Sequence, residues 1–181
     1  LIQGNEVWGT YQHPSVLGGI YAVCTNDGGS NADADFARFF GSNHVIRSNY
    51  AHDIEYDYGD VTRPNPDPHI DCFQTWGESG ETTSNILIER NWCRWPKADS
   101  NSDNEISSLE SLDGPVGTIT YQNNVFANMR QGINNAGSAV GQLNVLNNTF
   151  DHFIEEALIF GTVRTGDKIE NNVFYDVGTS G

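Results

Sequence analysis

The chain has 181 residues, with nine Lys plus Arg against 24 Asp plus Glu, and its net charge of −15 makes it strongly acidic. Nucleic acids are bound through clusters of Lys and Arg, so we expect no nucleic-acid partner, and no run of 18 apolar residues is available to insert into a membrane. The 20 Asn and 19 Gly disfavour a helical protein. An apolar fraction of 37% instead indicates the narrow core of a solenoid.

Short segments of alternating apolar residues recur along the chain, each around an anchor asparagine. The anchors are Asn5, Asn49, Asn91, Asn124, Asn148 and Asn172. Their spacings are 44, 42, 33, 24 and 24 residues, so we expect each of the first two gaps to hold about two turns of the repeat. Alternation with period 2 predicts strands, and strands that recur at a fixed interval stack in parallel.

The last three segments show the repeat most clearly, because residues 123–126, 147–150 and 171–174 all read Asn-Asn-(Val/Thr)-Phe. This predicts one all-β domain over residues 1–181, a right-handed parallel β-helix of about seven coils, with an asparagine ladder and a stack of phenylalanines inside. Strand-like sequence runs to both ends. We therefore expect a fragment of a longer chain, or a segment that stacks end to end.

Three excursions interrupt the repeat, over residues 9–35, 55–68 and 96–114. Insertions in a solenoid gather on one face, which is often the binding face. Carboxylates are numerous in the second and third excursions, and the oxygen ligands that calcium prefers are present there. The candidate Ca²⁺ ligands are Asp57, Asp60 and Asp67, with a second group at Asp99, Asp103 and Glu105. A solvated acidic loop is the alternative.

The segments at 35–41, 43–54 and 69–75 resemble right-handed β-helix repeat proteins of the pectate-lyase-like superfamily. They read Asp-Phe-Ala-Arg-Phe-Phe-Gly, Asn-His-Val-Ile-Arg-Ser-Asn-Tyr-Ala-His-Asp-Ile and His-Ile-Asp-Cys-Phe-Gln-Thr. The resemblance extends from about residue 35 to the end of the sequence. It implies the fold, and it implies a protein that is extracellular or on a cell or virion surface. Because the superfamily includes polysaccharide lyases, glycoside hydrolases, tailspikes and adhesins, it does not fix the chemistry.

Two His–Asp pairs supply the candidate catalytic residues, which are His52, Asp53, His69 and Asp71, together with Arg38. A coil of about 21 residues would bring the two pairs onto adjacent coils. Two carboxyl groups about 5 to 9.5 Å apart suit glycoside hydrolysis, whereas a lyase needs a base such as His52 or His69, and a cation such as Arg38 beside the uronate carboxylate. In the alternative interpretation these side chains only cap turns and accept backbone hydrogen bonds.

Candidate substrate-binding residues are Trp76, Trp95 and Tyr56, because flat rings with polar edges suit the apolar faces of sugars, and Gln74, a polar residue set among strand segments. Trp92 stands beside the inward-facing positions and is at least as well placed for the core. Cys72 and Cys93 are 21 residues apart, which permits a disulfide between stacked coils, although we slightly favour buried free thiols.

The sequence therefore predicts binding of a polysaccharide, with cleavage as an additional activity, along the face of the three excursions. Neutral glycans fit better than polyuronates, because a charge of −15 repels a polyanion unless calcium bridges the two. The alternative is a structural or adhesive element of a fibre, spike or filament that self-associates through open β-helix ends without catalysis.

Overall fold

The computed structural model describes residues 1–8, 36–52, 69–76, 83–95, 103–110, 116–135 and 140–178. Within these ranges the chain is all-β, with parallel strands and no helix. In chain order the strands are β1 (Ile2–Gln3), β2 (Glu6–Trp8), β3 (Ala37–Arg38), β4 (Val45–Arg47), β5 (Tyr50–His52), β6 (His69–Trp76), β7 (Ile86–Glu89), β8 (Trp92–Arg94), β9 (Asp103–Glu110), β10 (Val116–Gln122), β11 (Val125–Met129), β12 (Gln131–Asn135), β13 (Val140–Leu146), β14 (Thr149–Phe153), β15 (Leu158–Phe160), β16 (Lys168–Glu170) and β17 (Val173–Val177).

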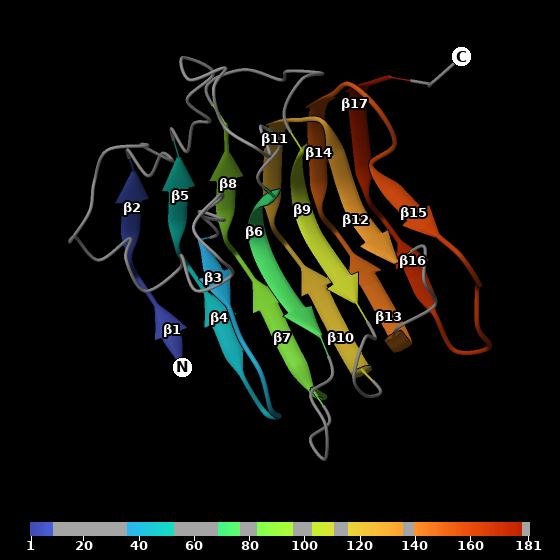
Figure 1. Ribbon diagram of the computed structural model, residues 1–181. Helices are drawn as coiled ribbons and strands as arrows, with labels where there is room; N and C mark the ends of the chain where they lie inside the picture. The colour runs from blue at the N-terminus through green and yellow to red at the C-terminus, as the bar shows by residue number, and fades with distance from the viewer. Residues whose placement is uncertain are drawn as a thin grey trace, which may run out of the picture.

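Every third strand lies beside its predecessor, so the strands form three parallel sheets (Figure 1). Sheet A has the order β1-β4-β7-β10-β13-β16, sheet B has β2-β5-β8-β11-β14-β17, and sheet C has β3-β6-β9-β12-β15. The chain passes through one strand of each sheet before it returns to the first. The predicted parallel all-β class is therefore confirmed.

The expectation of two turns in each of the first two gaps is wrong. Ile2 is in register with Ile46, and Ile46 with Ile88, although these residues are 44 and 42 positions apart. Each gap is thus a single step between neighbouring strands of sheet A. The described residues give six strands in each of sheets A and B, where about seven coils were expected.

Hydrogen bonds connect the six anchor asparagines, which we call the asparagine column. In the five anchors after Asn5, the Oδ1 atom accepts both the side-chain Nδ2 and the backbone N–H of the asparagine one step earlier, as Asn148 does from Asn124 at 2.9 and 3.0 Å. From Asn49 onward, the Nδ2 group also donates to a strand carbonyl of the preceding step, such as Ile88 O for Asn124. The residue before each anchor from Asn49 to Asn172 has a positive φ of 54 to 56°, and three of these five residues are Asn, which tolerates this conformation better than most residues.

The core is a set of side-chain columns that face inward from successive strands. In sheet B, Phe126 and Phe150 are fully buried, and their ring centroids are 5.7 Å apart. Phe174 stacks on Phe150 at 5.0 Å with the two planes 7° apart. The predicted column of phenylalanines is confirmed, and its interior position is confirmed for Phe126 and Phe150. Phe174 remains 49% exposed, because β17 is the last strand of sheet B in the described part of the chain.

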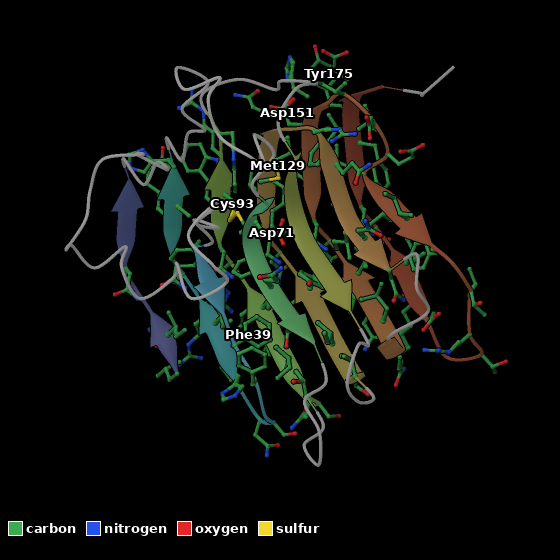
Figure 2. All side chains as sticks on the ribbon, in the orientation of Figure 1. Phe39, Asp71, Cys93, Met129, Asp151 and Tyr175 are labelled. Carbon is green, nitrogen blue, oxygen red and sulfur yellow. A yellow bond between two sulfur atoms is a disulfide. The ribbon has the colours of Figure 1, made fainter. Side chains whose placement is uncertain are left out.

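Cys72 of β6 and Cys93 of β8 form a disulfide, with Cα atoms 6.4 Å apart (Figure 2 labels Cys93). The slight preference for free thiols was wrong. Both residues are fully buried, so the two sulfurs face the same interior between sheets C and B. The bond links two strands that do not pair with each other in either sheet.

Candidate functional site

Sheet B presents two columns of side chains on its outer surface. Strand alternation explains this arrangement, because the buried column of Cys93, Phe126 and Phe150 has a residue of opposite orientation on either side of each member. In register from β5 to β17, the first column is Tyr50, Trp92, Val125, Thr149 and Val173, and the second is His52, Arg94, Ala127, Asp151 and Tyr175, of which Ala127 is buried at 7% exposed. We call this surface the sheet B face.

Three stacked rings lie at one end of the sheet B face. The ring of Tyr50 stacks on that of Trp92 with centroids 4.6 Å apart and planes 27° apart, and on that of His52 at 4.1 Å and 19°. Trp92 is nevertheless 45% exposed, so much of its indole faces solvent. We call Tyr50, His52 and Trp92 the aromatic platform.

The local fold determines how Trp92 is presented. Asn91 is fixed by the asparagine column on one side, and Cys93 by the disulfide on the other. Because side chains alternate along a strand, an inward Cys93 leaves Trp92 and Arg94 facing outward. The rigid supports on both sides hold the indole in place, as a binding surface requires.

A charged group lies toward the other end of the sheet B face. His152 Nδ1 is 2.5 Å from Asp151 Oδ1, and His152 Nε2 is 3.3 Å from Asp176 Oδ2. The ring of Tyr175 meets the imidazole edge-on at 5.6 Å. His152 and Asp176 both have positive φ, at 56° and 50°. Asp151 and Tyr175 lie near each other at the top of Figure 2. We call Asp151, His152 and Asp176 the imidazole–carboxylate group.

The structure does not bring the predicted catalytic residues together as expected. His52 belongs to sheet B and is in register with Arg94, whereas Asp71 belongs to sheet C and is in register with Glu105. They lie on consecutive strands of one pass through the sheets rather than on stacked neighbours, because β5 pairs with β8 and β6 pairs with β9. Asp71 is 0% exposed, which places its carboxylate in the interior.

Two predicted substrate-binding residues are also buried. Trp95 is 2% exposed, so its ring offers no face to a sugar, and that prediction is wrong. Gln74 is buried in β6, in register with Arg38 of β3. Conversely, Trp92 lies on the surface rather than in the core. Its alignment with Val125, rather than with Phe126, was the sequence signal for that position.

The other predicted site residues are placed by backbone alone or not at all. His69 and Trp76 are the first and last residues of β6. Asp53, Tyr56, Asp57, Asp60 and Asp67 lie outside the described residues, as does Asp99. In the described ranges no three His, Cys, Asp or Glu residues are arranged to hold a metal ion, and the calcium prediction stays a prediction. No helix in those ranges could span a membrane.

The sheet B face therefore combines aromatic rings, one arginine and an imidazole held between two carboxylates. The rings can stack against the C–H faces of a sugar, and the charged groups can bind its polar substituents. Comparisons with models of protein families, with curated proteins and with solved structures find no match for this chain.

Proposed function

We propose that this chain forms part of a right-handed parallel β-helix that binds a polysaccharide on the sheet B face. The observation that carries the proposal is the exposed indole of Trp92, which stacks on the ring of Tyr50 with the two centroids 4.6 Å apart. Tryptophan is mostly buried in proteins, so an exposed indole held in a stack suggests a surface that a ligand covers.

The shape of the face favours a linear chain of sugars over a single sugar. From β5 to β17 the face crosses four strand steps, which span about 19 Å at the usual strand spacing. The column that starts at Tyr50 and Trp92 continues through Val125, Thr149 and Val173 without a charged residue. An uncharged strip of this kind suits the hydroxyl-rich surface of a glycan.

The proposal is binding rather than cleavage. Asp71 is fully buried, so its carboxylate does not reach a glycan on the outer surface, and Asp53 lies outside the described residues. We further propose that the protein works outside the cytosol, on a cell or virion surface or secreted. The Cys72–Cys93 disulfide supports this location, because such bonds persist in oxidising compartments.

Affinity electrophoresis in gels that contain a soluble β-glucan, xylan or mannan tests the proposal. We expect at least one polymer to retard the protein, and Trp92→Ala to reduce that retardation about tenfold, as expected for loss of a central aromatic contact. Val163→Ala, an exposed change outside sheet B, is the control and should migrate like the wild type. Equal retardation of Trp92→Ala and wild type would show that the polysaccharide does not bind at the sheet B face.

A second candidate function is that of a structural or adhesive element. It is favoured by the apolar edge at β16 and β17, where Ile169 and Phe174 are exposed although they are in register with the buried Val145 and Phe150. Another β-helix coil, from a second copy, would cover this edge. Light scattering measures the mass of the protein across a concentration series. A mass that stays at the monomer value for the full-length natural protein would contradict self-association.

A further inference from the structure

Arg94 lies beside the aromatic platform, two residues after Trp92 on the same side of β8. It is in register with His52 on one neighbouring strand and with Ala127 on the other. Positions i and i+2 of a strand face the same way, so the guanidinium and the exposed indole occupy one surface. The chain has only nine Lys plus Arg against 24 acidic residues, so a cation at this position is notable.

Within the described residues, Arg94 differs from arginines whose charge is matched. Arg47 lies 3.8 Å from a carboxylate oxygen of Glu89, and Arg130 lies 2.9 Å from one of Glu155. Arg94 has no ion pair with any described carboxylate, and it is partly buried. A guanidinium that forms no ion pair with the described residues is available to bind an anion.

We propose that Arg94 and the aromatic platform bind an acidic sugar within the polysaccharide, with the sugar ring against Trp92 and its anionic substituent on Arg94. The inference rests on the proposed function and specifies its ligand. A planar guanidinium binds a carboxylate or a sulfate through two parallel hydrogen bonds, which an ammonium group does not reproduce. The shared chemistry is a single anionic group, and separate probes distinguish the two kinds.

The imidazole–carboxylate group limits how closely acidic sugars can be spaced along a ligand that binds the sheet B face. Asp151 is in the same column as Arg94, two strand steps away, or about 10 Å. Two carboxylates and one imidazole leave a net negative charge whether or not His152 is protonated. An acid on every sugar would place a like charge against this group. The ligand is therefore a glycan in which acidic sugars are spaced by neutral ones, oriented with an acid over β8.

The test uses chemically matched probes on one backbone. The neutral polymer that binds best among β-glucan, xylan and mannan is compared with two derivatives of the same polymer, one sparsely and one densely sulfated. Where its sugars carry primary hydroxyls, a third derivative is sparsely oxidised so that it bears carboxylates. For wild type, we expect at least one sparsely modified polymer to bind about fivefold or more tightly than the neutral one, the range of a partly exposed charge contact. The densely sulfated polymer should lose that gain.

Three variants separate the roles of the side chains. Arg94→Gln should abolish the preference, measured as the ratio of the affinity for the sparsely modified polymer to the affinity for the neutral polymer, and Arg94→Lys should recover only part of that ratio. Arg90→Gln, an exposed change four residues away, should leave it intact. The preference should also fall as NaCl is raised, because exposed charge contacts are screened.

The outcomes distinguish failure of this inference from failure of the proposed function. If the neutral polymer binds through Trp92 but neither sparse modification improves affinity, or if Arg94→Gln keeps the preference, the acidic-sugar inference is overturned and glycan binding stands. If neither the neutral polymers nor glucuronoxylan and sparsely sulfated dextran bind, both proposals are overturned. If the sparsely carboxylated and the sparsely sulfated polymers both bind more tightly than the neutral one, Arg94 recognises a negative charge of either kind. If only one of them does, its anionic group is the one that Arg94 binds.

Discussion

Asn91 and Asn124 are 33 residues apart, yet they are joined by two hydrogen bonds to one atom. The Oδ1 of Asn124 accepts the backbone N–H of Asn91 at 2.9 Å and its side-chain Nδ2 at 3.1 Å. Both side chains are buried, where an unpaired amide is costly. The pair therefore fixes the register of two strand steps at the point where sheet A passes into sheet B.

Asn124→Ala should strongly destabilise the protein. The change leaves Asn91 N–H, Ile88 O and Asn148 Oδ1 with fewer partners in the interior, and we expect a loss of about 3 kcal/mol in the free energy of unfolding. Urea denaturation followed by circular dichroism measures it. Asn123→Gly is the control, since that exposed residue has φ 55°, a conformation that glycine adopts freely. A similar midpoint for both variants would contradict the structural role of the column.

The disulfide should contribute about 3 kcal/mol, because it closes a 21-residue separation in the unfolded chain. We expect the double variant Cys72→Ala/Cys93→Ala to unfold at lower denaturant concentration by that amount. Dithiothreitol should shift the wild-type transition in the same direction and leave the double variant unchanged. Cys24→Ala, at the third cysteine, should retain the sensitivity to reductant. Loss of that sensitivity in Cys24→Ala would show that another pairing operates.

Gly132→Ala should prevent close approach between neighbouring steps of the structure. An added Cβ would lie 1.6 Å from the backbone oxygen of Ala157, which accepts the N–H of Ile133 at 3.0 Å. Because backbone atoms cannot swing aside, we expect at least about 3 kcal/mol of destabilisation or failure to fold. Gly141→Ala is the matched control, since its nearest atom would be at 3.4 Å, an ordinary contact. The melting temperatures of the two variants are compared by thermal unfolding. A Gly132→Ala protein as stable as Gly141→Ala would contradict the close packing of Gly132 against Ala157.

Phe150→Ala should cost about 3 to 5 kcal/mol, because its fully buried ring lies between those of Phe126 and Phe174. Phe174→Ala removes the same group from the exposed edge of the stack, so a loss of about 1 kcal/mol is expected from the smaller area that it buries. The comparison of the two variants by guanidinium denaturation isolates the contribution of burial. Equal losses would mean that Phe174 is covered in solution, as the self-association alternative requires.

The strand class and the inward columns could be predicted from the sequence, because they depend on local alternation and on a 24-residue repeat that is nearly perfect from Asn124 to Asn172. The number of steps could not. A gap of 44 residues contains the same single step as a gap of 24, and only the pairing of Ile2 with Ile46 reveals this.

The site was harder to predict than the fold for a related reason. His52 and Asp71 are close to one coil apart in sequence, but the position of each strand within its own sheet decides which residues stack. Trp92 and Trp95 differ by three positions on one strand segment, and that odd offset places one outside and the other inside. Alignment of 90–93 with 123–126 contains this information, whereas the abundance of aromatic residues near the excursions does not.

The asparagine column repeats the same hydrogen bonds whether successive members are 24 or 44 residues apart. Register is thus set locally at each step and is independent of the length of chain between steps. Insertions between strands can be lengthened, shortened or exchanged without moving the sheet B face. The molecule is in this respect a modular scaffold, on which new connecting segments could be grafted one step at a time around an unchanged sheet B face.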